Sequence, residues 1–253
     1  MSAAAPPIWD AVYPVRSYDV DARGRLSVAA IANFLQDAAG CHAHALGVSI
    51  DLLHPLHLTW VLVRLRLQLE RHLGWQDNLH IRTWPSRQER LISQRDFLLL
   101  DEAGGAVGRC VTSWVVMDLR RWRPQRLTAL PAALPSPERP RALALPPDKI
   151  APPAAFSQEC RFQVGDRDLD RNGHVNNVRY IEWALETVPP TVLNTHGLEA
   201  LAIDFVGEAL RGEQILAGSL AADQAQTTFH HGIRSQSTGN ELARAMTRWH
   251  RLV

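Results

Sequence analysis

The chain has 253 residues, enough for one large domain or two of ordinary size, and its 46% hydrophobic and 21% charged residues are typical of a globular protein. The formal net charge of +1 excludes a global attraction to nucleic acid or to an anionic membrane, so an anionic partner needs a local patch. The three cysteines, Cys41, Cys110 and Cys160, form no close pair in the sequence, which argues against a disulfide framework and a zinc ribbon.

The N-terminal segment, Met1 to Pro7, lacks the basic region and apolar core of a secretion signal. No uninterrupted apolar run reaches the roughly 20 residues that a membrane-spanning helix needs. We therefore expect a cytoplasmic protein with no membrane partner.

The first half begins with a pattern, over residues 8–20, that predicts a strand leading into a turn. Ser27 has the side chain of a helix N-cap, and Gly47 lies just beyond the expected end of that helix. The helix carries an apolar stripe formed by Val28, Ile31, Phe34, Leu35 and Ala38. The stripe predicts a long helix with one buried face.

From Trp60 the hydrophobic period changes to two, the period of a strand. The apolar face carries Val61, Val63, Leu65, Leu67 and Leu69, and the opposite face carries Arg64, Arg66, Gln68 and Glu70. Further strands are predicted over residues 78–84, 91–100 and 107–119. One helix followed by antiparallel strands predicts an α+β fold.

Residues 131–155 form a proline-rich segment, with prolines at positions 131, 135, 137, 140, 146, 147, 152 and 153. So many prolines exclude a helix or a central strand. We interpret the segment as an extended linker on the surface, separating a domain over residues 8–130 from one over residues 156–253.

The second half repeats the order of the first. A strand over residues 160–164 leads into a polar turn and a helix over 178–188 that stops at Pro189-Pro190. Strands are then predicted over residues 201–208, 214–221, 227–235 and 241–252. Matching Asp168 with Asp19, an offset of 149 residues, also matches Asp170 with Asp21 and Gly173 with Gly24. The chain therefore contains two copies of one domain, which can pair as a pseudo-dimer, and further homodimerisation is left open.

The polar turn of the second copy concentrates reactive side chains. Asp170, Asn172 and His174 stand at alternate positions, so in an extended turn they leave on one side and converge. The helix that follows can be capped by Asn176 or Asn177, and its N–H groups carry a partial positive charge suited to an oxyanion. In the first copy Arg23 and Arg25 replace Asn172 and His174, so only the second copy keeps this chemistry.

The stretch Asp170-Arg171-Asn172-Gly173-His174-Val175-Asn176-Asn177, followed by Tyr180 and Trp183, resembles the active-site signature of the acyl-ACP thioesterases of plants and bacteria. The first half resembles the N-terminal domain of that family in Trp60-Val61-Leu62, Trp75-Gln76-Asp77, Thr83-Trp84-Pro85-Ser86, Arg95-Asp96-Phe97 and Trp114-Val115-Val116-Met117-Asp118-Leu119. The resemblance covers nearly the whole chain, apart from the linker and the two ends.

This resemblance implies two tandem hot-dog domains, each a long helix wrapped by an antiparallel sheet. It places the substrate tunnel with the first domain, whose site is degenerate, and catalysis in the second. It assigns catalytic roles to Asp170, Asn172 and His174, and to a glutamate from the strand after the helix, here Glu208. Many plant members carry Cys directly after that glutamate, but this chain has Ala209, which excludes a Cys–His nucleophile pair there.

The implied function is hydrolysis of acyl-ACP thioesters in fatty-acid biosynthesis, with acyl carrier protein as partner and with no cofactor or metal. Glu208 and His174 would activate water, and Asn172 with the N–H groups of Asn176, Asn177 and Val178 would stabilise the oxyanion. Alternatively, Asp170 would attack and form an anhydride. Two other functions stay open: an acyl-CoA thioesterase and a non-catalytic acyl-binding protein.

The densest basic run follows the last predicted strand of the first domain and contains Arg120, Arg121, Arg123 and Arg126. It is either a solvated segment or a docking surface for an acidic carrier protein or the phosphate of its prosthetic arm. No set of histidines in the sequence has the spacing of a credible metal site.

Overall fold

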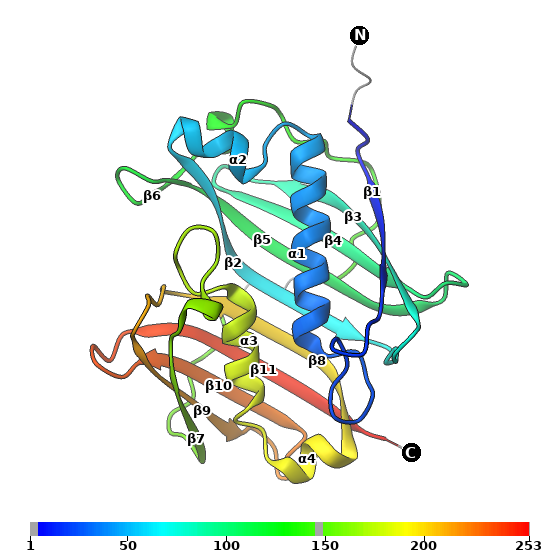
Figure 1. The fold of residues 1–253 in the computed structure, drawn as a ribbon, viewed down its shortest axis with the longest axis vertical. Helices are drawn as coiled ribbons and strands as arrows, with labels where there is room; N and C mark the ends of the chain where they lie inside the picture. Colours follow the sequence, from blue (N-terminus) through cyan, green and yellow to red (C-terminus); the bar gives the residue numbers. More distant parts are fainter. Residues whose placement is uncertain (1–4, 145–148, 253) are drawn as a thin grey trace. The chain divides into compact units, whose positions relative to one another are not determined.

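The computed structural model describes residues 5–144 and 149–252 (Figure 1). The chain divides into two compact units, one formed by Met1–Val63 and Glu70–Leu145 and the other by Arg64–Leu69 and Pro146–Val253. No helix of the described residues is both long enough and apolar enough to cross a bilayer.

The first unit places one long helix against an antiparallel sheet. Its elements are β1 (Trp9–Pro14), α1 (Val28–Ala45), α2 (Ile50–Leu53), η1 (His54–Leu56), β2 (Leu58–Leu69), β3 (Asn78–Gln88), β4 (Ile92–Leu100), β5 (Ala106–Asp118), β6 (Arg123–Gln125) and η2 (Leu127–Ala129). The strands lie in the order β1-β3-β4-β5-β2, and β6 pairs with β5. As predicted, Ser27 caps α1: its hydroxyl accepts the N–H of Ala30 at 3.1 Å.

Strand β3 continues past the end predicted at Trp84. The ladder that it forms with β4 shifts register between Pro85 and Arg87. A register shift accommodates the missing proline N–H, so the strand reaches Gln88.

The second unit repeats this plan with a shorter helix. Its elements are β7 (Gln158–Gln163), η3 (Asp166–Asp168), α3 (Asn177–Leu185), α4 (Pro190–Thr195), β8 (His196–Phe205), β9 (Gln214–Ala221), β10 (Thr228–Ser235) and β11 (Glu241–Arg251). The helix predicted over residues 178–188 ends earlier, at Leu185, so Pro189-Pro190 does not stop it. Pro190 instead stands at the first position of the next helix, α4. The strand order β8-β11-β10-β9-β7 is antiparallel throughout.

The last part of β2 belongs to this second unit, since Arg64 to Gln68 pair with β8 from Asp204 to Ala200. Arg66 was expected on a polar, half-exposed face, and that prediction is wrong: its side chain is buried. Its Nη2 lies 2.5 Å from Oδ1 of the buried Asp204, and its Nη1 donates to the carbonyl of Ile203. Burial of this cation is tolerated because a carboxylate and a carbonyl compensate its lost hydration.

Both units therefore have a helix packed on an antiparallel sheet, α1 in the first and α3 in the second, as Figure 1 shows. This is the α+β, tandem hot-dog architecture that the resemblance implied. Apolar side chains between helix and sheet form the core, among them Leu35, Leu79 and Ile81 in the first unit and Ile181 and Ile203 in the second.

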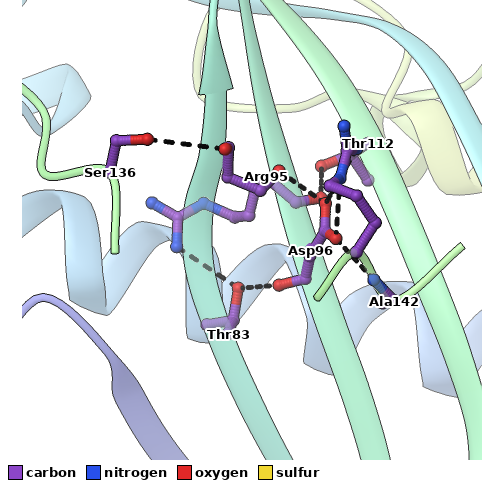
Figure 2. A network of polar contacts seen from close by, with 8 residues as sticks. Thr83, Arg95, Asp96, Thr112, Ser136 and Ala142 are labelled. Carbon is purple, nitrogen blue, oxygen red and sulfur yellow. Dashed lines mark hydrogen bonds and ion pairs between the residues drawn. The ribbon is translucent and has the colours of Figure 1, made fainter. Parts of the chain in front are cut away.

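The described parts of the proline-rich segment, residues 131–144 and 149–155, contain no helix or strand, and Pro146 and Pro147 lie outside the described residues. The segment is nevertheless attached. The buried Asp96 accepts the N–H of Ala142 at 2.6 Å and forms an ion pair with Arg141 (Figure 2). On the second unit, Asp204 accepts the N–H of Ile150 at 2.9 Å. Two buried carboxylates thus fix the segment at two points.

Candidate active site

The polar stretch of the second unit folds as a tight turn that leads into α3. The N–H of Asp170 donates to the carbonyl of His174 at 2.7 Å, and Leu169 pairs with Val175. Gly173 has a φ of +78°, a left-handed conformation that glycine adopts without steric cost. The backbone alone therefore holds the ends of the turn together.

Asp170 organises this turn from inside. Its Oδ1 accepts the backbone N–H groups of Asn172 at 2.8 Å and His174 at 3.2 Å. Its Oδ2 accepts the side-chain amide of Asn172 at 3.3 Å. The predicted meeting of Asp170 and Asn172 is therefore seen between side chains, whereas His174 is joined to Asp170 through its backbone.

The N-terminus of α3 is capped by Asn176, whose Oδ1 accepts the N–H of Val178 at 3.0 Å. The N–H of Asn176 itself donates to the carbonyl of Asp168 at 2.8 Å. Of the three N–H groups expected to face an oxyanion, only that of Asn177 finds no acceptor in the described part of the chain. Of these three groups, the N–H of Asn177 is therefore the one that can donate a hydrogen bond to an oxyanion.

Glu208 lies three residues beyond the end of β8, and not on the strand as predicted. The strand stops early because the N–H groups of Val206 and Gly207 both donate to the carbonyl of Leu242, which takes the chain out of the ladder. The Oε2 atom of Glu208 lies 3.6 Å from Nδ1 of His174, and the two side chains are 33% and 27% exposed. A small change of side-chain rotation would bring the carboxylate and the imidazole to hydrogen-bond distance.

The electrostatics at Glu208 make its carboxylate a better proton acceptor than an ordinary glutamate. Partial burial raises the pKa of its carboxyl group, His174 opposes that rise, and the negative charge of Asp170 adds to it. A carboxylate with a raised pKa beside an imidazole has the properties of a general base.

Two aromatic residues of the motif lie on α3. Trp183 packs against Phe162, with stacked rings whose centroids are 5.7 Å apart. Tyr180 is equally buried, but its hydroxyl also accepts the N–H of Ala209 at 2.9 Å. Sequence reasoning missed this contact; the one available signal was a phenol on an apolar helix face, since a buried phenol needs a hydrogen-bond partner.

Thiol chemistry has no place beside Glu208, because the next residue, Ala209, is fully buried and carries no thiol. Cys160 instead lies on β7 and donates to the carbonyl of Glu186 at 3.4 Å. Burial and the charge of Glu186 raise the pKa of the Cys160 thiol, which disfavours the nucleophilic thiolate. Within residues 5–144 and 149–252, no three His, Cys, Asp or Glu side chains are placed to hold a metal ion.

The predicted basic run lies on the first unit, on the hairpin formed by β5, the turn after it and β6, and continues to Arg126. Asp118 closes the turn by accepting the N–H groups of Arg120 and Arg121 at 2.8 and 3.0 Å. Nη2 of Arg120 lies 2.5 Å from Nε2 of His57. The side chains of all four arginines are exposed, and none forms an ion pair with a described carboxylate.

Comparison with known proteins identifies both halves. Residues 7–129 match the family model of the acyl-ACP thioesterase N-terminal domain, and residues 153–251 match that of the C-terminal domain. The chain is 30% identical to the chloroplastic oleoyl-acyl carrier protein thioesterase 2 of Arabidopsis thaliana and 32% identical to the oleoyl-acyl carrier protein thioesterase of Coriandrum sativum. Each alignment covers 93% of this chain and 74% of the relative.

Solved structures share the fold. The 12:0-ACP thioesterase from Umbellularia californica superposes with a TM-score of 0.83 at 22% identity, covering 98% of both chains. An acyl-ACP thioesterase from Bacteroides thetaiotaomicron gives 0.82 at 24% identity, covering 96% of this chain and 98% of the other. With both domain models matched in order and relatives at 30% identity or more over most of their length, the chain belongs to the acyl-ACP thioesterase family.

Proposed function

We propose that this chain is a thioester hydrolase that cleaves acyl-ACP into a free fatty acid and the carrier thiol, as a step of fatty-acid biosynthesis. The observation that carries the proposal is the approach of Glu208 to His174 beside the Asp170–Asn172 turn, in a chain of this family. The relatives that share both domains are named as thioesterases acting on acyl carrier protein substrates.

We assign water activation to Glu208 and His174. In the first step Glu208 removes a proton from a water molecule, and the water oxygen bonds to the thioester carbonyl carbon. The carbonyl oxygen becomes an oxyanion, which the side-chain amide of Asn172 and the N–H of Asn177 stabilise at the positive end of α3. His174 orients the Glu208 carboxylate and interacts with the proton that it gains.

The second step breaks the carbon–sulfur bond. The oxyanion reforms the carbonyl, and the electron pair of the broken bond leaves with sulfur as the carrier thiolate. Because a thiol of this kind has a pKa of about 8.5, the thiolate leaves readily and accepts the proton held by Glu208. Water is consumed, the carboxylic acid and thiol are formed, and the enzyme returns to its starting charge.

Direct attack by Asp170 is the competing route, and the contacts of its carboxylate disfavour it. Three hydrogen bonds from within the turn engage its two oxygens, which lowers their nucleophilicity. A single turnover in heavy-oxygen water distinguishes the routes. Water attack leaves Asp170 unlabelled after peptide mass analysis, whereas label in the Asp170 carboxylate would establish the anhydride and overturn our assignment.

We also propose that the basic hairpin docks the acidic carrier. Arg120, Arg121, Arg123 and Arg126 place four exposed charges on one short segment, and Asp118, which interacts with Arg120 and Arg121, compensates only part of that charge. Such a patch attracts an acidic protein or the phosphate of its prosthetic arm. We also assign the binding of the acyl chain to the first unit. Three further points stay predictions: the pairing of the two domains as a pseudo-dimer, the formation of a homodimer and the cytoplasmic location.

Charge reversal tests the docking. Arg121→Glu with Arg123→Glu should raise KM for an acyl-ACP several-fold, since rim charges act mainly on association, and should leave KM for a short thioester analogue unchanged. Arg161→Glu with Arg251→Glu, on exposed arginines of the second unit, is the matched control and should change neither value. Equal KM values for both pairs on acyl-ACP would remove the hairpin from the docking surface.

The substrate class is tested by thiol release from acyl-ACP and acyl-CoA of graded chain length. We expect a higher kcat/KM for the ACP thioester at the preferred chain length. A preference for acyl-CoA would favour the alternative enzyme, and acyl binding with no thiol release from either carrier would contradict hydrolysis altogether.

A further inference from the structure

One residue, Ala209, connects the backbone segments of the two residues that we assign to water activation. Ala209 directly follows Glu208, and its carbonyl accepts the N–H of Val175, which directly follows His174, at 3.1 Å. The N–H of the same Ala209 donates to the Tyr180 hydroxyl at 2.9 Å. The backbone next to Glu208 is therefore held on one side by the turn and on the other by α3.

The rest of this segment is held at its two ends, where Val206 and Gly207 donate to the carbonyl of Leu242 and Gly212 donates to that of Val164. Residues 206–213 lie outside any helix or strand, and the side chains of Val206 and Leu210, two residues either side of Glu208, are 52% and 51% exposed. Beyond Ala209, the N–H of Leu210 contacts only the carboxylate of Glu213, at 3.3 Å. Between these ends, the bond to Tyr180 holds the peptide group directly after Glu208, which is the one that sets the direction of the backbone there.

Packing fixes the phenol itself. The ring of Tyr180 is 2% exposed and makes edge contacts with Trp183 and Phe205, at centroid distances of 5.2 and 5.9 Å. Burial raises the pKa of the phenol, the N–H of Ala209 opposes that rise, and the nearby carboxylates of Glu208, Glu213 and Asp170 add to it. The hydroxyl therefore stays neutral and can accept the Ala209 N–H across the physiological pH range.

The first unit shows that the fold does not need this bond. There the N–H of Leu26 donates to the carbonyl of Leu73 at 2.7 Å, as Val175 does to Ala209. The helix position that corresponds to Tyr180, counted from the N-caps Ser27 and Asn176, is Ile31, which is buried and has no hydroxyl. The same turn and helix form without a phenol, and the phenol is found in the unit that carries Glu208.

We propose that Tyr180 is a positioning residue that holds Glu208 at its distance from His174 through the Ala209 peptide. This role rests on the proposed function, because it presupposes that Glu208 activates water. Tyr180 itself is buried behind the turn and acts through Glu208.

Tyr180→Phe tests the role, since phenylalanine keeps the ring and removes only the acceptor. We expect kcat for acyl-ACP hydrolysis to fall about 10-fold because the base loses its alignment, with KM unchanged. The acid limb of the kcat profile should move to lower pH, because burial is the main cause of the raised pKa of Glu208 and a mobile carboxylate is better hydrated. Ile181→Val, a neighbouring buried change without a polar group, should lower Tm and leave that limb in place.

A double-mutant cycle separates this inference from the proposed function. In the Glu208→Gln background, Tyr180→Phe should cause no further loss of kcat, because the residue it positions is gone. If the two losses multiply, or if Tyr180→Phe alone leaves kcat and its pH profile unchanged, Tyr180 does not position Glu208. If Glu208→Gln alone keeps full activity, the catalytic assignment of Glu208 fails instead.

Discussion

The two units contain the same turn, and only in the second does it carry the side chains that we propose for hydrolysis. In both, an aspartate N–H donates to a carbonyl four residues later at 2.7 Å, from Asp21 to Arg25 and from Asp170 to His174. Gly24 and Gly173 both have a left-handed backbone. Both aspartates also accept the N–H groups two and four residues later through Oδ1. The aspartate and the glycine therefore belong to the scaffold.

The differences lie in what the remaining side chains do. In the first unit the Arg25 guanidinium folds back onto Asp21, with Nε and Nη2 at 3.0 and 2.9 Å from Oδ2. Burial acts to raise the pKa of Asp21, but the backbone N–H groups of Arg25 and Arg23 and the Arg25 guanidinium outweigh it and lower that pKa. In the second unit His174 approaches Glu208, whose pKa is raised. In the first unit the Arg25 guanidinium thus neutralises the Asp21 carboxylate. In the second unit the Glu208 carboxylate has, among the described residues, no such cation bound to it in place of His174 and is the base that we propose.

The largest effect should come from removing that base. Glu208→Gln is expected to lower kcat by about 10²- to 10⁴-fold, because a general base contributes on that scale. In the first unit Leu73 takes the place of Ala209, because its carbonyl accepts the N–H of Leu26, and the residue before it, His72, therefore corresponds to Glu208. His72→Gln should change kcat by about 2-fold at most. Steady-state thiol release from acyl-ACP measures both, and a similar loss in the two variants would break the comparison.

The pH dependence of kcat sharpens the same point. Glu208 works as a base only when deprotonated, so activity should rise as pH increases through its pKa, which lies above the ordinary 4.5. Asp170→Asn removes a charge that raises this pKa, and the acid limb should therefore move to lower pH. A profile that is flat across this range would contradict the role of Glu208.

Acid should lower the folding stability of both units, whereas its effect on catalysis should come from the second unit. His231, buried on β10 between Thr187 and Thr247, has a pKa lowered to about 3 by burial and by His230. His42 on α1 has a pKa lowered to about 4 by burial and by Arg95. Each folded pKa lies below 6.5, so the unfolded chain binds more protons and stability falls as pH decreases from about 6.5.

At pH 4.5 this linkage amounts to roughly 2 to 3 kcal/mol for His231, taking 1.36 kcal/mol per pH unit. The free energy of unfolding of His231→Gln, measured by urea denaturation between pH 7 and 4.5, should therefore fall less with acid than that of the wild type. Parallel curves for the two proteins would show that His231 is protonated when folded.

The aspartate of each turn should contribute stability, and Asp170 should contribute little as a nucleophile. Asparagine keeps one acceptor oxygen, so Asp21→Asn and Asp170→Asn should each cost about 1 kcal/mol of unfolding free energy. Asp170→Asn should lower kcat by about 10-fold through loss of its bond to the Asn172 amide. A complete loss of turnover in a folded Asp170→Asn protein would favour the anhydride route.

The smallest effects should come from the helix caps. Ser27→Ala and Asn176→Ala remove equivalent caps of α1 and α3 and should each cost about 1 kcal/mol. Only Asn176→Ala should also reduce kcat, because it loosens the helix end that presents the Asn177 N–H. Chemical denaturation and steady-state kinetics on both variants check this difference.

Much of this comparison could be predicted from the sequence. Helical and strand periods, the Ser27 cap and the matching Asp–Gly spacing of the two turns are local patterns, and the structure confirms the elements they predicted. The motif around His174 indicated a reactive turn because polar groups of different chemistry rarely concentrate before a helix without a purpose.

The remaining features depend on contacts between distant segments. The burial of Arg66 could not be predicted because Asp204, which compensates its charge, stands 138 residues away. The engagement of the Asn176 N–H by Asp168 and the bond between Tyr180 and Ala209 are likewise tertiary contacts. Period and spacing indicate which residues share a face, but they do not show which donor is already occupied.

The central claim is that hydrolysis belongs to the turn of the second unit. Its most direct test is a single-turnover measurement of thiol release from acyl-ACP by two matched variants, His174→Ala and Arg25→Ala. The Tm of each variant shows first that both are folded. We predict that His174→Ala lowers the rate by at least about 10²-fold and that Arg25→Ala changes it by about 3-fold or less. Equal losses in both variants, or full activity of His174→Ala, would contradict the claim.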